Sequence, residues 1–158
     1  MRLNIFCIAL IIAALGATAA SAQKAGSAMR TMYIVIADSS SDYQKLLGEA
    51  KSLSQLSGIP FDARNLIFTK EKGLHLPEDD SDVVYAGDYI WRRYADESIS
   101  LERRFPYFNN VRESDPTMII VAGIFETKKK AATALARIGG IAPRAFIRPT
   151  KLYMGCMH

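Results

Sequence analysis

The chain has 158 residues with 20 basic and 16 acidic side chains, a formal net charge of +4 at pH 7, and 49% hydrophobic residues. This length and composition suit one domain with its own apolar core. There are two cysteines, Cys7 and Cys156, and the first lies in a predicted signal peptide. The mature chain is therefore expected to form no intramolecular disulfide and to rely on its core for stability.

The first 22 residues are typical of a secretory signal peptide. Arg2 supplies the positive charge, Ile5–Leu15 is apolar but too short to span a bilayer, and Ala20–Ala22 is a cleavage site. The small residues before the site disfavour the alternative of an uncleaved anchor, and Cys7 lies too deep in the apolar segment for lipidation. We expect an exported protein, periplasmic by preference and secreted as second choice, with no transmembrane anchor after cleavage.

A first strand–helix–strand unit is predicted near the start of the mature chain. The apolar run Tyr33–Ala37 is typical of an inner strand. Asp42–Leu56 carries its apolar residues on one helical stripe, Gly58 ends that helix, and Pro60 prevents its continuation. Leu66–Phe68 then predicts the second strand of the unit.

A second unit repeats the pattern. Met118–Ala122 predicts a strand, Thr127–Ile138 a helix, and Ala145–Ile147 the strand that follows. The last strand is expected to continue at Leu152–Met157, and Pro149 between the two parts favours either an edge position or a second short strand. Two such units predict an α+β, βαββαβ ferredoxin-like sandwich, with a four-stranded antiparallel sheet and both helices on one face.

The rest of the chain is a leader and an insert. Residues 23–31 are small and polar and predict a flexible leader before a single domain at 32–158. Residues 70–115 have no counterpart in the repeat and are the natural place for specialisation. Within them, Tyr89–Tyr94 and the alternating Ser98–Glu102 are predicted to pair as a hairpin.

The second unit resembles the SPOR (sporulation-related repeat) domain over Val121–Ile138. Gly123-Ile124-Phe125 is similar to the Gly-x-Phe turn of that family, whereas Ala37-Asp38-Ser39 stands at this place in the first unit. The Ala/Leu-rich helix of the family is matched by Ala131, Ala134 and Leu135.

The resemblance implies a periplasmic binding module rather than an enzyme. SPOR domains bind peptidoglycan glycan strands stripped of stem peptides, through the sheet face away from the helices. The implied partner is peptidoglycan or another envelope glycan, and no cofactor is implied. The insert at 70–115 departs from the compact family pattern and could cover the binding face or rebuild it.

A basic and aromatic cluster in the insert is the best candidate for ligand contacts. Sugar rings stack on aromatic faces, and guanidinium groups form paired hydrogen bonds with carboxylates and phosphates. Arg103-Arg104 and Phe105–Phe108 extend the same composition. The alternative is a hairpin whose aromatic side chains form a satellite core while its arginines are solvated. The predicted ligand-binding residues are Ser39, Ser40, Tyr85, Trp91, Arg92, Arg93 and Tyr94.

Other candidate chemistry is weaker, and we predict no catalytic residues. Lys128–Lys130 opposes the dipole of its helix and could face an anion, but a solvated run explains it better. The acidic residues of 78–82 lack calcium-loop spacing. Cys156 and His158 are weak candidates for a copper or thiol site, or Cys156 is a buried hydrophobe.

Two alternative functions remain beside glycan binding. One is a protein-interaction module, such as an inhibitor or immunity-type partner of a secreted hydrolase or a ligand of another envelope protein. The other is a copper or thiol protein. Export from the cytoplasm argues against the nucleic-acid binding that the same topology serves elsewhere.

Overall fold

The computed structural model describes residues 28–155. The signal peptide predicted at 1–22 and the residues Cys156 and His158 lie outside the described residues. The first strand begins at Met29, so residues 29–31 belong to the sheet rather than to the predicted leader.

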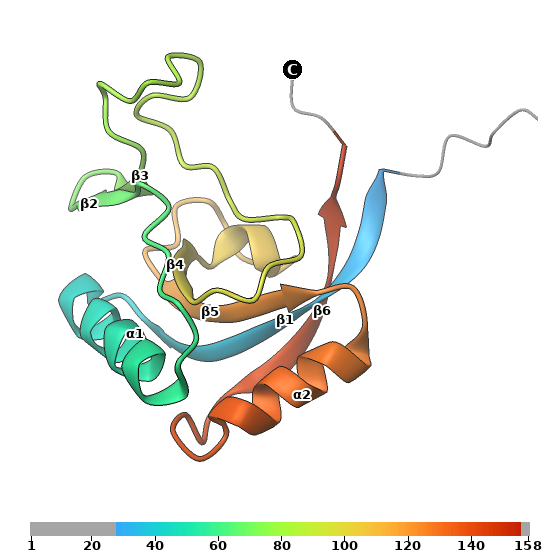
Figure 1. The fold of residues 1–158 in the computed structure, drawn as a ribbon. Helices are drawn as coiled ribbons and strands as arrows, with labels where there is room; N and C mark the ends of the chain where they lie inside the picture. The colour runs from blue at the N-terminus through green and yellow to red at the C-terminus, as the bar shows by residue number, and fades with distance from the viewer. Residues whose placement is uncertain (1–27, 156–158) are drawn as a thin grey trace, which may run out of the picture.

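A four-stranded antiparallel sheet forms the centre of the structure (Figure 1). Its strands are β1 (Met29–Ser40), β4 (Ser100–Arg103), β5 (Met118–Phe125) and β6 (Phe146–Tyr153), in the order β4-β5-β1-β6. This arrangement confirms the predicted α+β class. The edge position of β6 is also as predicted, and the strand runs through Pro149 without a break.

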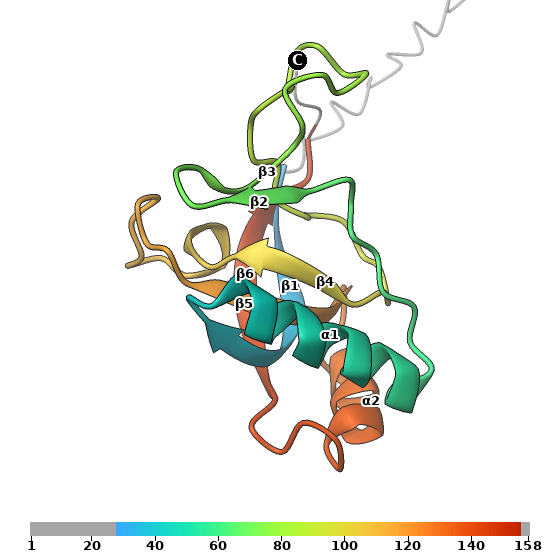
Figure 2. The same cartoon turned by 90° about the vertical axis from the view of Figure 1, so that its left-hand side faces the viewer.

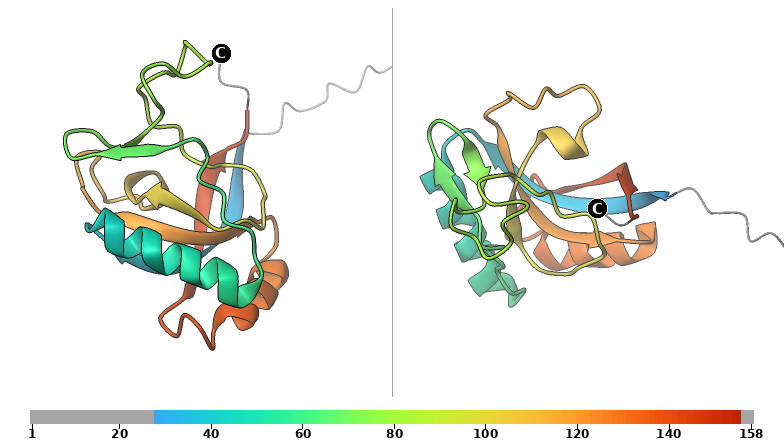
Figure 3. Two further views of the ribbon diagram at one scale, coloured as in Figure 1. Left: turned by 60° about the vertical axis from the view of Figure 1, so that its left-hand side comes forward. Right: turned by 90° about the horizontal axis from the view of Figure 1, so that it is seen from above.

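Both predicted helices are present on one face of the sheet (Figure 3). α1 is Tyr43–Ser57, and the side chain of Asp42 caps it by accepting a hydrogen bond from the Lys45 backbone N–H. α2 is Lys128–Ile138, and Thr127 caps it in the same way. Such caps satisfy backbone donors that have no partner within the helix, so both helix starts are local properties of the sequence.

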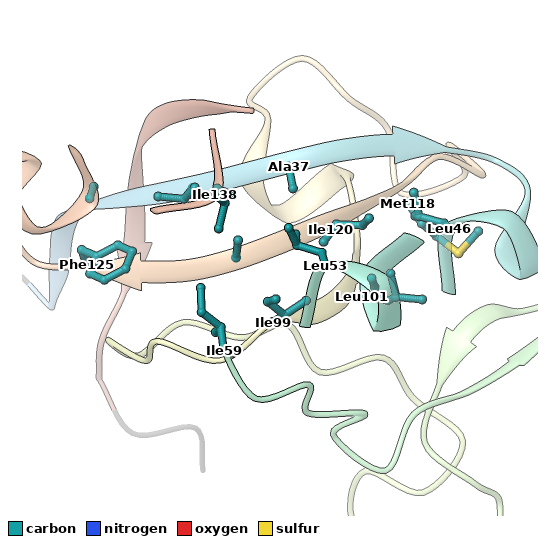
Figure 4. Packing of buried hydrophobic residues seen from close by; sticks show 14 of the residues in the cluster. Ala37, Leu46, Leu53, Ile59, Ile99, Leu101, Met118, Ile120, Phe125 and Ile138 are labelled. Atoms are coloured by element: carbon teal, nitrogen blue, oxygen red, sulfur yellow. The ribbon is translucent and has the colours of Figure 1, made fainter. Parts of the chain in front are cut away.

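The helices and the sheet enclose the larger apolar core (Figure 4). The residues of α1 and α2 that face the sheet enter this core, and each strand contributes about every second residue to it. The members labelled in the figure are Ala37, Leu46, Leu53, Ile59, Ile99, Leu101, Met118, Ile120, Phe125 and Ile138.

The opposite face of the sheet is also buried. Its apolar side chains are covered by Tyr107 from the short 3-10 helix η1 (Phe105–Tyr107) and by the partly buried rings of Trp91 and Phe108. Figure 3 shows η1 on the side of the sheet opposite the two helices. The buried sheet residues on this face are Met32, Ile34, Ile36, Ile119, Val121, Ile124 and Leu152.

The second sheet strand differs from the prediction. The run expected to supply it forms β2 (Ile67–Thr69), which pairs only with β3 (Gly73–His75) in a separate hairpin. The sheet position is taken by β4, which lies inside the segment 70–115 expected to be an insert. The two units are therefore not equivalent, because the first returns to the sheet only after a long excursion.

The predicted pairing of Tyr89–Tyr94 with Ser98–Glu102 is wrong. Residues 89–94 form no strand, and Phe61 makes the β-bridge to Ile99 beside β4. The Ile99 backbone N–H donates to Pro60 O at 2.8 Å, so the segment after α1 occupies the edge that the hairpin partner would need.

The predicted Gly-x-Phe turn is a bulge inside β5. The strand continues to Phe125, and its register with β1 shifts between the pairs Ile34–Ile124 and Ile36–Val121. Gly123 lies within this shift at φ +129°, where a Cβ would come within 2.6 Å of the Phe125 ring. Glycine is required here by both backbone conformation and space.

Replacement of this glycine should destabilise the fold. We expect Gly123→Ala to lower the free energy of unfolding by about 1–3 kcal/mol, because the backbone would be strained and the Phe125 ring displaced. Gly48→Ala in α1 is the matched control, since its Cβ would meet nothing within 4 Å and alanine favours a helix. Urea unfolding of both variants checks this, and equal stabilities would contradict it.

Candidate ligand-binding surface

A buried carboxylate organises the connection between α1 and β5. Glu102 on β4 is fully buried, and its two oxygens accept hydrogen bonds from Arg64 Nη1 at 2.8 and 2.9 Å. The Tyr89 hydroxyl donates to it at 2.6 Å and the Ser100 hydroxyl at 2.8 Å. A charged group can be buried in this way because both of its oxygens are paired, with a guanidinium group and with two hydroxyl groups.

Arg92 is part of this interior rather than of a surface. Its side chain is fully buried, and Nη1 donates to Ser98 O at 3.1 Å and to the Ser100 hydroxyl at 3.0 Å. Tyr107 donates to Arg92 O at 2.7 Å. Nε and Nη2 have no hydrogen-bond partner among the described residues. Arg92 is thus inaccessible to an external ligand, which corrects its predicted role as a ligand contact.

The other members of the predicted cluster point in different directions. Trp91 packs against the buried sheet face, whereas Tyr94 is 51% exposed. Arg93 donates to the backbone oxygens of Tyr153 and Gly155 at 3.2 and 2.8 Å. Because 89–94 is not a strand, strict alternation does not hold, and the cluster does not form one surface.

The remaining predicted contacts lie elsewhere. Ser39 and Ser40 end β1 beside Met118, whereas Arg93 contacts Tyr153, which pairs with the first residue of β1. Tyr85 lies in the loop after β3. The predicted set is therefore spread over the length of β1 and an outlying loop, and the structure does not bring it together.

Arginine side chains instead gather on aromatic rings next to η1. The guanidinium carbon of Arg103 lies 5.0 Å from the centre of the Phe105 ring, and that of Arg104 lies 4.8 Å from the Phe108 ring. Arg148 on β6 lies 4.0 Å from the same Phe108 ring. We call these five residues the arginine–aromatic surface. Rings hold guanidinium groups flat and leave their N–H edges available.

Few carboxylates balance these cations. Arg103 donates to Glu113 O, and Arg148 Nε donates to Tyr107 O at 2.8 Å, so both use backbone acceptors. Asp115 lies 3.7 Å from Arg104. A hydrogen bond from Thr117, with a smaller contribution from Arg104, lowers the pKa of Asp115, so this carboxylate is charged at neutral pH.

A polar groove runs beside the surface. One hollow of about 270 Å³ lies between the β2–β3 hairpin and the start of β5, and a shallow one of about 460 Å³ continues along 110–115. They share Ser114 and Asp115 and so adjoin. Basic residues outnumber acidic ones along them: Lys70, Lys72, Arg103, Arg104 and Arg112 against Glu71 and Asp115.

Sequence reasoning noticed these arginines but did not place them in the site. The signal was the run Arg103–Phe108, in which two basic residues precede three aromatic ones around a proline. The contribution of Arg148 could not be seen, because it reaches the Phe108 ring from the far edge strand of the sheet.

The other candidate chemistry finds little support among residues 28–155. No group of three or more metal-ligating side chains forms there. Lys128–Lys130 is fully exposed at the start of α2. A hollow of about 450 Å³ between α1 and the loop 141–144 has an apolar floor and the Asp38–Arg144 ion pair at its side.

Comparison with known proteins gives one distant match. The chain is 33% identical to an uncharacterized lipoprotein of Mycoplasma genitalium over 73 residues, which are 46% of this chain and 11% of that protein. The chain thus spans about a tenth of the relative it matches. No protein-family model and no solved structure matches the chain. Neither described helix is long and apolar enough to cross a membrane.

Removal of the Glu102 carboxylate should strongly destabilise the protein. We expect Glu102→Ala to destabilise the protein by about 3–5 kcal/mol, because the mostly buried Arg64 guanidinium would lose its counter-charge and the Tyr89 and Ser100 hydroxyls their acceptor. Glu113→Ala removes an exposed carboxylate from the same connection and should change stability by less than about 0.5 kcal/mol. Equal urea midpoints for the two variants would show that the network is dispensable.

The two tyrosines of this interior should make stability fall at alkaline pH. Burial, with the Glu102 charge, raises the pKa of Tyr89 and of Tyr107 well above 10.0. The unfolded chain loses these protons first, so their contribution is complete below pH 10 and is lost as pH rises through the folded values. Urea unfolding on both sides of pH 10 should show this decline, and Tyr107→Phe should flatten it.

Proposed function

We propose that this protein is an envelope-binding module that recognises peptidoglycan glycan strands, or a related envelope glycan, through the arginine–aromatic surface and its groove. The observation that carries the proposal is the set of three guanidinium groups held on the Phe105 and Phe108 rings, beside a groove with an excess of basic residues. The SPOR resemblance and the predicted signal peptide support an extracytoplasmic glycan as the ligand.

We propose the outer surface as the contact because the sheet face that SPOR domains use is covered by the protein's own side chains. Tyr107 and Trp91 cover that side of the sheet, and the sheet residues beneath them are buried. A glycan could reach it only if the whole connection lifted away, which would expose the charges around Glu102. The outer side of η1 is the accessible layer above the same face.

The chemistry of the groove fits a glycan that carries carboxylates or phosphates. Guanidinium edges donate paired hydrogen bonds to such groups and to neighbouring hydroxyls, and Ser41 and Ser114 add neutral donors and acceptors. The two hollows share Ser114 and Asp115, so one ligand could contact both. Binding through exposed cations should weaken as salt increases.

A cell-envelope location rests on two observations of different kinds. A signal peptide is predicted at 1–22, and the distant relative is named as a lipoprotein. The name of the relative says nothing of a ligand, so the choice of a glycan depends on the surface chemistry and on the SPOR resemblance.

Sedimentation with purified peptidoglycan sacculi tests this function. We expect the mature protein to co-sediment, with a preference for sacculi stripped of stem peptides. Arg103→Ala/Arg104→Ala should reduce the bound fraction at least about tenfold, since each charge-assisted contact contributes roughly 1.5–3 kcal/mol. Lys128→Ala/Lys129→Ala removes the same charge from α2 and should bind normally.

Two results would overturn the proposal. Failure of the folded wild-type protein to sediment with either preparation would exclude peptidoglycan as the ligand. Equal losses in the two double variants would show that binding follows net charge rather than the arginine–aromatic surface.

A further inference from the structure

A loop at one end of the molecule presents two exposed apolar side chains. The segment 76–88 projects beyond the β2–β3 hairpin, away from the sheet and helices (Figures 1 and 2). Val83 is 86% and Val84 75% exposed, which makes them the most exposed large hydrophobic residues in 28–155. Single exposed hydrophobic residues are common, but an adjacent pair on a projecting loop needs an explanation.

The loop is held closed by its own hydrogen bonds. The Leu76 backbone N–H donates to Asp88 O at 2.8 Å, and that of Gly87 donates to Pro77 O at 3.1 Å. The Val84 N–H donates to the Asp82 side chain at 3.3 Å. The two valines are thus displayed on an ordered turn, so little conformational entropy would be lost when a partner covers them. We call 76–88 the valine loop.

Acidic side chains surround the two valines. Glu78, Asp79, Asp80 and Asp82 lie on the same loop. Glu78 pairs with Lys72 and Asp80 with Asn65, whereas Asp79 is exposed and has no ion-pair partner within 28–155. A partner should therefore offer an apolar hollow with a basic rim.

Such a hollow exists on the opposite end of the same molecule. A cavity of about 230 Å³ lies between the start of the β4 region, the end of β5 and α2. Ile59, Ala122, Phe125 and Ala134 form its apolar wall. Its charged rim consists of Lys130, Arg137 and Glu97, with a net positive charge. We call it the α2 hollow. Figures 1 and 2 show α2 at the end of the molecule away from the valine loop.

We propose that the valine loop of one molecule docks into the α2 hollow of a second copy. The apolar tip meets the apolar wall, and Asp79 approaches the Lys130 side of the rim. Because the two surfaces differ and lie at opposite ends, the contact is head-to-tail, and repetition produces an open chain of molecules rather than a closed dimer. One loop tip buries a small area, so the association is weak and appears at high protein concentration.

The first test is the concentration dependence of the mass of the mature protein in solution. Sedimentation velocity should show a weight-average mass that rises above the mass of the mature monomer as concentration increases, through dimers to longer species. Val83→Ser/Val84→Ser should remain monomeric. Leu56→Ser is the control, because Leu56 is 67% exposed on α1, outside both surfaces, and its replacement should leave association unchanged.

A charge exchange identifies the two surfaces. Asp79→Lys alone places a cation against the basic rim, and Lys130→Glu alone places a carboxylate against the acidic loop, so each variant should associate less than the wild type. An equimolar mixture of the two should associate again, because each altered end then meets an end of opposite charge. Both positions are exposed, so the fold should be unaffected, as circular dichroism can check.

Clear outcomes would overturn the proposal. A monomeric wild type at every concentration excludes self-association. Association that persists in Val83→Ser/Val84→Ser, or that mixing fails to restore, excludes this pair of surfaces. Self-association is measured without glycan, and direct glycan contact is tested with variants of the arginine–aromatic surface, so the two proposals can fail independently.

Discussion

The burial of the Glu102 carboxylate is the constraint on which the rest of this structure depends. A carboxylate in the interior must be paired, and here Arg64 comes from the segment after α1, Tyr89 from the middle of the connection and Ser100 from the same strand. These bonds tie two distant parts of the chain to the edge strand β4. Arg92 is buried beside these bonds, and Tyr107, which lies over the sheet, donates to Arg92 O.

Tyr89 links this interior to the proposed ligand surface. Its hydroxyl donates to Glu102 and accepts a hydrogen bond from the Arg103 backbone N–H at 2.9 Å, while its ring lies 5.4 Å from the Arg103 guanidinium carbon. The position of Arg103 on the surface thus follows from the position of Glu102 inside. The segment between α1 and β5 covers one face of the sheet, and the same segment orients arginines on its own outer side.

Individual strands and helix starts were predictable from the sequence, whereas the pairing and packing of distant segments were not. Apolar runs identified β1 and β5, and the capping residues Asp42 and Thr127 located the helix starts. β4 was placed in a hairpin because its buried residues include Ser100 and Glu102, whose polarity is typical of a solvated strand face. Partners that are distant in the sequence, Arg64 and Tyr89, allow Glu102 to be buried. Arg92 was assigned to a ligand for the same reason, since an arginine looks exposed until its buried partners are known.

Weak contacts at separate places can act together on an extended polymer. The arginine–aromatic surface lies over one sheet face, whereas the valine loop and the α2 hollow lie at opposite ends of the molecule. A polymer that concentrates several copies along its length raises the effective concentration of each loop near a neighbouring hollow. If both proposals hold, head-to-tail contact slows the release of every copy, because one molecule leaves only when its polymer contacts and its neighbours are lost together. By linkage, the proposed self-association and polymer binding would then strengthen each other by the same factor, although neither surface touches the other.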